Sequence, residues 1–570
     1  MESYPKVTID LTKNPTVTWT ATHNQSGANI SLLSVRNKAY SDFMSLSLNY
    51  SILDGTLSQE LTNIAYASNV ISDYKCEISG CTITGTFAEP QDFVATTLNF
   101  GKNFPKKIYI EYFDSNSSLI TYETIDNIDS EIILTNRSVT NCRQMRMTFQ
   151  EMWEPLYICC LQEWTVGALL EYGQKNLISL RLNETRDPIT RELPISTLQM
   201  NAYPILGNFD IRDPNGAIKY LKPGVVATLS TTIVMDDETF SINFGKWYIK
   251  KVESGDNSTL KITFEDLIGR LNDFKFSKSL LYGALDITDS RRWARSVIQS
   301  IVSEALVECE FDDGAIGGMV FGYLPYTSCR DALKQICFEN RFIVQTNDKI
   351  RISQYSDNKA TIDIISSSNI TEPPKFELLD LTKTVTVPYV NGVSLESNTS
   401  DLATDINHSA TYAHEPATDV SLVRVSGDGT ALLFENNLTN AHVIFLNSQG
   451  TFKLVGRKYV PTGGQNQLTM EDQNASGTLK VNITASTSVT SVNAYSIAHN
   501  TIGFLNRNIL KTTFEYINTG QRAGSKVQID LPGKQMVGWI THQSIDLVNG
   551  MLTQIEILGE QNVLLANSDN

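Results

Sequence analysis

The sequence has 570 residues, of which 41% are hydrophobic and only 19% are charged, and this length predicts about four domains. Its 46 basic and 62 acidic residues give a net charge of −16 at pH 7. This charge argues against nucleic acid as the main partner, because phosphate contact needs clustered Lys and Arg. The one basic pair that stands out, Arg291–Arg292, lies in a helical pattern and is interpreted as a solvated face.

Neither a signal peptide nor a membrane span is predicted. The segment MESYPKVTID lacks a basic stretch followed by an apolar one, and apolar runs such as PLYICCL are far too short to cross a bilayer. We therefore expect synthesis and folding in the cytosol. No Cys-x-x-Cys motif occurs, and free, buried thiols are expected for a protein that folds in the cytosol. Cys76 and Cys81 could meet across a hairpin, but the cytosol does not favour a disulfide between them. The eight cysteines are Cys76, Cys81, Cys142, Cys159, Cys160, Cys309, Cys329 and Cys337.

Three strand-rich blocks are predicted in the first half of the chain. Residues 1–28 hold one alternating run, TVTWTAT, and are interpreted as an attachment arm or a first strand. Residues 29–162 alternate with period two in TTLNF, KKIYIEYF and QMRMTF, which predicts an antiparallel sandwich. Residues 163–280 form another all-β block with the strands NLISLRLN and FSINFGKWYIKKV, and they close with TLKITFEDLIGRLNDF, a strand that becomes a helix.

Residues 281–374 are predicted to form a small α/β unit. Apolar residues recur at helical spacing, and Asp289 or Ser290 is expected to cap this helix. The stripe consists of Trp293, Val297, Ile298, Ile301, Val302, Ala305 and Leu306. A second helix is expected to begin at a Ser328 cap, and a hairpin with its turn at Asn347–Asp348 follows.

The remainder of the chain returns to the β pattern. Residues 375–398 and 506–570 are predicted to form one closing domain, with hairpin turns at Pro532–Gly533 and Asn549–Gly550. Residues 399–505 carry further short strands and are interpreted as an insertion into that domain.

No arrangement of catalytic or metal-binding residues is recognisable. The segment Gly520–Lys526 resembles a phosphate loop, but it has three residues between its glycines and precedes a strand instead of a helix; SGDGT at 426–430 fits a dinucleotide loop no better. Asp236–Glu238 and Asp312–Asp313 lie in turn-like contexts, where solvated loops are expected and calcium binding stays open. No Gly-x-Ser-x-Gly elbow is present. No His-x-x-x-His spacing occurs among His23, His408, His414, His442, His499 and His542. We therefore predict no catalytic residue, no cofactor and no metal.

Several short motifs follow one another in a characteristic order. Within 160–275 these are ELPISTLQM, FDIRDPNGAIKYLKPGVVATL, FGKWYIKKVES and LKITFEDLIGRLND; then come SCRDALKQICFENRFIVQTNDKIRIS and VGWITHQSIDLVNGMLTQIEILG. This order resembles the baseplate hub and tail-tip proteins of phages, prophages and phage-tail-like particles of Gram-positive bacteria. TTLNFGKNFPKKIYIEYFDSNSSL and QMRMTF resemble the discoidin-like, galactose-binding jelly roll that precedes the first barrel in some members.

The resemblance implies a mainly β fold with minor α content. It implies a discoidin-like jelly-roll sandwich at 29–162, a first hub barrel at 163–280 and a second hub barrel at 375–398 plus 506–570. The barrels would be separated by the α/β unit at 281–374. No motif in the β-rich insertion at 399–505 resembles a segment of the family.

The same resemblance implies a structural, non-enzymatic role. The chain would be a baseplate-hub or tail-tip subunit that forms a ring, usually as a homotrimer, and connects the tail tube to the baseplate. Its expected partners are the tail tube, the tape-measure protein and other baseplate proteins. Its expected location is the virion tail tip, after synthesis in the bacterial host cytoplasm.

Two other functions stay open beside this one. The jelly roll is a candidate for binding cell-wall carbohydrate during host recognition, and sugar recognition favours an aromatic platform with polar neighbours. The candidate residues are Trp153, Arg143 and Tyr74, with core packing or inter-domain contact as the competing interpretation. An enzyme that acts on wall polymer is the third hypothesis, and the absence of a catalytic arrangement argues against it.

Overall fold

The computed structural model describes most of the chain. It covers residues 2–560, except 14, 26–27, 36–64, 102, 136, 187–191, 206–219, 236–237, 255–258, 284–289, 316, 355–362, 448–449 and 532–533, and also residues 564–565. Within these ranges the protein is mainly β, as predicted, with four α-helices. None of the described helices combines the length and apolar character that a bilayer crossing needs.

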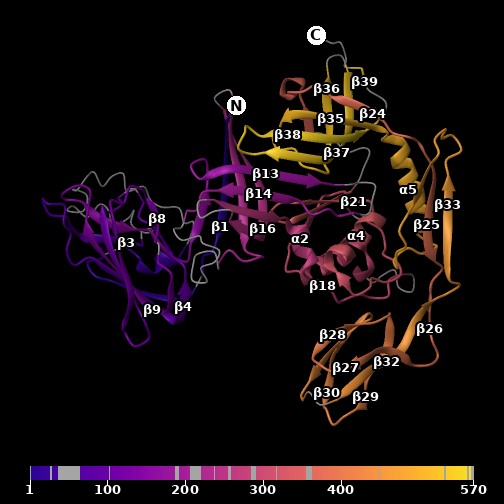
Figure 1. Cartoon of the computed structure of the whole chain (residues 1–570), viewed down its shortest axis with the longest axis horizontal. Coiled ribbons are helices and arrows are strands. Elements are labelled where there is room, and N and C mark those ends of the chain that lie inside the picture. The colour runs from indigo at the N-terminus through magenta and orange to yellow at the C-terminus, as the bar shows by residue number, and fades with distance from the viewer. Residues whose placement is uncertain are drawn as a thin grey trace.

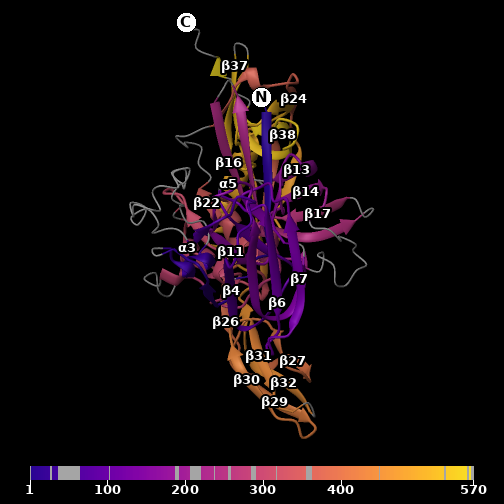
Figure 2. The same cartoon turned by 90° about the vertical axis from the view of Figure 1, so that its left-hand side faces the viewer.

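The N-terminal sandwich (residues 17–166) packs a five-stranded antiparallel sheet against smaller sheets, as Figures 1 and 2 show. All strand pairs of the large sheet are antiparallel, which confirms the predicted antiparallel sandwich, and in β6 every second residue is buried. The large sheet contains β2 (Val17–Ala21), β4 (Thr82–Phe93), β9 (Val139–Glu151), β6 (Lys107–Phe113) and β7 (Leu119–Asp126). The other elements are η1 (Ile30–Ser34), β5 (Thr96–Asn99), β8 (Ile132–Leu134) and β11 (Glu163–Val166), and the pair β3 (Tyr66–Ile71) and β10 (Ile158–Leu161).

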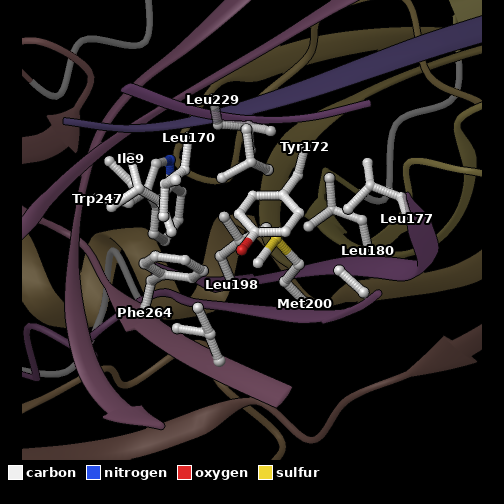
Figure 3. Close-up of a cluster of buried hydrophobic side chains, with 14 of the residues drawn as sticks. Ile9, Leu170, Tyr172, Leu177, Leu180, Leu198, Met200, Leu229, Trp247 and Phe264 are labelled. Atoms are coloured by element: carbon white, nitrogen blue, oxygen red, sulfur yellow. The ribbon is translucent and has the colours of Figure 1, made fainter. Parts of the chain in front are cut away.

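The first barrel takes its opening strand from the start of the chain. β1 (Glu2–Asp10) pairs antiparallel with β12 and β15. In the sequence, the sandwich is therefore inserted between β1 and β12, two neighbouring strands of this barrel. The run TVTWTAT instead contributes β2 to the sandwich. Figure 3 shows how Ile9 of β1 joins Leu170, Trp247 and Phe264 in the barrel core. The other strands are β12 (Leu169–Tyr172), β13 (Leu177–Thr185), β14 (Thr197–Ala202), β15 (Val226–Met235), β16 (Glu238–Ser254) and β17 (Leu260–Glu265).

The helix–hairpin unit (residues 267–354) matches most of its predicted pattern. Ser328 caps α4 by accepting a hydrogen bond from the Asp331 N–H, and the hairpin turns at residues 347–349. The predicted cap of α3 is wrong: Ser290 opens a 3-10 turn, Asp289 lies outside the described residues, and the N-cap is Trp293, whose side chain makes no capping bond. Two residues of the predicted apolar stripe are not in the core, because Trp293 is 39% exposed and Leu306 is 89% exposed. The elements are α2 (Leu267–Asn272), β18 (Lys275–Phe276), η6 (Ser290–Arg292), α3 (Ala294–Glu304), β19 (Cys309–Phe311), β20 (Thr327–Ser328), α4 (Cys329–Glu339), β21 (Phe342–Thr346) and β22 (Ile350–Gln354).

The second barrel (residues 363–378, 510–560 and 564–565) surrounds a core of aliphatic and aromatic residues. The predicted Asn549–Gly550 turn joins β37 to β38, whereas the predicted Pro532–Gly533 turn lies outside the described residues. The strands are β23 (Asp363–Ile365), β24 (Lys375–Leu378), β35 (Leu510–Ile517), β36 (Lys526–Leu531), β37 (Lys534–Asp546), β38 (Leu552–Gly559) and β39 (Leu564–Leu565), with η7 (Ser367–Asn369) after β23.

The insertion has two parts. Its strands already begin at Thr382, because β25 pairs with β33 and β34 and packs against α5, not against the second barrel. A distal group of strands extends from this part toward the bottom of Figure 1. The first part contains β25 (Thr382–Val390), β33 (Gln465–Glu471), β34 (Leu479–Asn482) and α5 (Ala494–Arg507). The distal strands are β26 (Val393–Leu395), β27 (Ser400–Ile406), β28 (Ala410–Ala413), β29 (Ala417–Ser426), β30 (Ala431–Asn436), β31 (Asn440–Phe445) and β32 (Thr451–Pro461).

Gly245 provides a test of the contact between the first barrel and the hairpin turn. It has φ +79°, and a Cβ atom there would lie 2.2 Å from the carbonyl carbon of Asn347. We expect Gly245→Val to lower the free energy of unfolding by at least about 2 kcal/mol, since both the backbone conformation and the close approach exclude a side chain. Denaturant unfolding measures this, with Gly392→Val as the matched control because nothing lies within 4 Å of its Cβ position. Equal stability of the two variants would contradict the packing described.

Candidate functional site

The N-terminal sandwich contains an open pocket of about 390 Å³. Its apolar walls come from Phe104, Met152, Trp153 and Tyr157, and its polar groups from Asn103, Asp129 and Glu154. These residues lie on the three loops that follow β5, β7 and β9. The end of β5 at Asn99 pairs with the start of β11 at Glu163, whereas the other end of β11, at Val166, leads to the first barrel. The pocket, which follows Asn99, therefore lies at the end of this strand pair that points away from the first barrel.

A buried serine, Ser72, holds the backbone of the turn after β9 by two hydrogen bonds. The Ser72 hydroxyl donates to the Glu154 carbonyl at 3.0 Å and accepts from the Tyr157 N–H at 3.0 Å, while Leu156 adopts φ +64°. Met152 is buried in the sandwich core next to this turn. The backbone of the turn is therefore fixed, and the side chains on it project from a defined frame.

The polar groups of Trp153, Tyr157 and Asn103 have different environments. The Trp153 indole N–H donates to the Ile128 carbonyl at 2.8 Å, which fixes the ring, yet 46% of the residue stays exposed. A hydrogen bond to Glu154 is the main cause that raises the pKa of the Tyr157 hydroxyl. The Asn103 side-chain nitrogen is buried, and it has no acceptor among the residues that the structure describes. The pocket therefore offers an aromatic face and two carboxylates.

The structure does not bring the three predicted sugar-binding residues together. Trp153 lines the pocket, and Tyr74, which is 86% exposed, lies in the adjoining turn, where the Cys76 carbonyl accepts from the Met152 N–H. Arg143 donates to the Ala88 carbonyl near the opposite end of β9. At about 3.3 Å per residue, the eight residues from Arg143 to the end of β9 span roughly 26 Å.

A second notable site is the junction of the two barrels. β13 pairs with β14 of the first barrel and, from Arg181 to Thr185, with β37 of the second barrel from Asp546 to His542. One sheet of main-chain hydrogen bonds therefore runs through both barrels.

Glu184 is the centre of this junction, and it is 2% exposed. Its carboxylate accepts bonds from the Arg522 guanidinium, from the Gln543 amide at 2.6 Å and from the Ala523 N–H at 3.2 Å. All three donors come from the second barrel, whereas Glu184 comes from β13. The ion pair thus joins the two barrels and leaves neither charge alone in a buried site.

A second buried ion pair extends the junction to the helix–hairpin unit. The Arg186 guanidinium lies 3.0 Å from Asp266 and donates to the Val344 carbonyl at 2.9 Å. Asp266 also caps α2 by accepting from the N–H groups of Ile268 and Gly269. β13, α2 and the hairpin are therefore held by a single set of side chains.

The junction predicts a stability change in acid. Burial by itself raises the pKa of the Glu184 carboxyl, but Arg522, Arg186 and Gln543 outweigh burial and hold this pKa below its usual value. Its contribution to stability is therefore present above the unfolded pKa of about 4.3 and is lost as the pH falls through the lower folded pKa. We expect the free energy of unfolding to fall more steeply below about pH 4 in the wild type than in Glu184→Gln. Denaturant titrations between pH 7 and pH 3 at constant ionic strength measure this, and equal slopes would contradict it.

No family model and no curated protein matches the chain. Among solved structures it is similar to a tail protein from Neisseria meningitidis MC58, at 11% identity and TM-score 0.40 over 69% of this chain and 94% of that one. It is also similar to the 43 kDa tail protein of prophage MuSo2 from Shewanella oneidensis, at 10% identity and TM-score 0.38 over 69% and 95%. A Streptococcus pneumoniae fucose binding module, SpX-3, matches 27% of this chain and 94% of its own length at 11% identity and TM-score 0.18. At these scores the likenesses decide neither the fold nor the function of this chain.

Where the structure describes them, the other motifs considered in the sequence lie on turns and at strand ends. The residues after Gly520 lead into β36, so the phosphate-loop pattern ends in a strand, and SGDGT forms the turn after β29. Asp312 is paired with Arg351 at 2.7 Å. Asp236 and Asp237 lie outside the described residues, and Glu238 opens β16. Within the described ranges no three His, Cys, Asp or Glu side chains form a metal-type group, and all eight cysteines are free thiols.

Proposed function

We propose that this chain is a structural subunit of the baseplate hub or tail tip of a phage or phage-tail-like particle. In this proposal it forms a ring, as a homotrimer, below the tail tube and contacts the tube, the tape-measure protein and the baseplate. It is made in the host cytoplasm and has no enzymatic role. The motif order in the sequence supports the family, and the barrel junction supports the mechanical role.

The continuous sheet through both barrels is the observation that carries the proposal. Domains in one chain normally move relative to each other unless their interface is extensive. Here main-chain pairing from β13 to β37 and the buried Glu184–Arg522 ion pair connect them. A subunit whose two barrels move as one body is suited to the wall of a symmetric ring, where each copy must present the same surfaces to its neighbours.

Immunogold electron microscopy of particles from the producing strain tests this location. An antibody against the chain is expected to label the tail end opposite the head, and deletion of its gene is expected to leave tubes without an assembled tip. Labelling along the whole tube, on the head, or nowhere on the particle would contradict the proposal.

Carbohydrate binding by the N-terminal sandwich is a second candidate function, and it is compatible with the first. The half-exposed Trp153 ring, fixed at the mouth of a pocket with hydrogen-bonding neighbours, favours it, because sugar sites combine an apolar face with a few placed polar groups. Binding of the full chain to host cell walls is expected to fall at least tenfold in Trp153→Ala. Tyr122→Ala is the matched control, since Tyr122 is 53% exposed on β7 and does not line the pocket. Equal losses, or no loss, in the two variants would refute this candidate.

A further inference from the structure

The charges of the pocket in the N-terminal sandwich restrict what it can bind. Of the described residues that line it, the charged ones are Asp129 and Glu154, both acidic and both on exposed loops. Carboxylates accept hydrogen bonds and donate none at neutral pH. A ligand that fits here has to present donors, and positive charge on those donors strengthens each bond.

We propose that the pocket selects an amino sugar with a free, protonated amine; this rests on the carbohydrate-binding function proposed above. An ammonium group supplies three donors and no acceptor, which complements the two carboxylates. The face of Trp153 adds attraction to the same charge, because a cation near an indole ring is stabilised by the ring quadrupole. An acidic sugar would instead meet two like charges.

The turn that carries two of the lining residues is held in place by hydrogen bonds. The Ser72 hydroxyl bonds to the backbone of both Glu154 and Tyr157, so these two lining residues extend from a fixed turn. The amine of the sugar would thus meet a carboxylate that extends from a fixed turn, beside the face of Trp153.

The charge of the whole chain favours the same ligand class. With a net charge of −16, the protein attracts cationic polymers and repels anionic wall polymers over a distance of about 8 Å at physiological salt. A partly deacetylated glycan would therefore be enriched near the surface, and the pocket would add specificity to that attraction.

Calorimetric titration of the full chain tests the inference with three tetrasaccharides of equal length. These are a glucosamine oligomer, its fully N-acetylated counterpart and a uronic acid oligomer. We expect the free amine to bind about tenfold more tightly than the acetylated sugar, which corresponds to one charge-assisted hydrogen bond. Glu154→Gln and Asp129→Asn are each expected to reduce that preference, and Trp153→Ala to abolish binding of all sugars.

The outcomes separate this inference from the function on which it rests. Equal or tighter binding of the acetylated or acidic oligomer would overturn the amine preference and leave carbohydrate binding intact. Binding of tetralysine that matches the glucosamine oligomer and survives Trp153→Ala would show charge attraction alone, and would also overturn it. No binding of any oligomer, together with wild-type cell-wall binding by Trp153→Ala, would refute both.

Discussion

Replacing Glu184 with alanine is expected to lower the free energy of unfolding by about 3–5 kcal/mol, the usual cost of leaving one partner of a buried ion pair alone. The change leaves the Arg522 guanidinium without its carboxylate, removes one of the two acceptors of the Gln543 amide and removes the acceptor of the Ala523 N–H. Because all these groups lie between the barrels, the loss is expected first at the junction. Hydrogen exchange should speed up most for the amides of β13 and β37 that pair with each other.

An exposed ion pair in the same barrel is the control for this prediction. Lys6 and Glu171 lie 2.6 Å apart with about half of each side chain exposed, so Glu171→Ala should change stability by less than about 1 kcal/mol. Removing both buried charges, as in Glu184→Met with Arg522→Met, should restore part of the loss, since no charge then stays unpaired. A Glu184→Ala protein as stable as Glu171→Ala would show that the junction does not hold the barrels together.

Replacing Trp247 with alanine is expected to cost about 3–5 kcal/mol, the range for truncating a large aromatic side chain in a packed core. Trp247 is 1% exposed and packs among the residues that Figure 3 shows inside the first barrel. The same substitution at Trp153 removes the same atoms from a ring that is half-exposed, and it should cost less than about 1.5 kcal/mol.

The two tryptophan variants therefore separate packing from binding. Thermal or denaturant unfolding should reveal a large loss for Trp247→Ala only, and cell-wall binding at a temperature where both proteins are folded should reveal a large loss for Trp153→Ala only. If Trp153→Ala destabilised the protein as much as Trp247→Ala, the indole would be a core residue and the pocket assignment would fail.

Much of the fold was predictable because alternation and capping are local signals. The alternation in KKIYIEYF, the Ser328 cap and the Asn347–Asp348 turn each depend on neighbouring residues, and each agrees with the structure. That β1 belongs to the first barrel was not predictable, because the strands that pair with it, β12 and β15, lie more than 150 residues away. The same holds for β25, which alternates as a barrel strand would but pairs within the insertion.

The candidate sites were predictable only in part, for the same reason. Trp153 was identified as a candidate from residue type and region, but the acidic neighbours Asp129 and Glu154 come from separate loops and carry no sequence signal that links them. Arg143 shares a strand with the pocket turn, yet an extended strand carries it to the far end of the sheet. The Glu184–Arg522 pair joins positions 338 residues apart, which no local pattern could indicate.

Native mass spectrometry of the purified full-length chain, followed by imaging of the same particles, tests the central claim most directly. We predict a mass three times that of the 63.4 kDa chain, and a ring with threefold symmetry in which the paired barrels form the wall and the N-terminal sandwiches lie outside it. A protein that stays monomeric at every concentration, and is absent from purified tails, would contradict the claim.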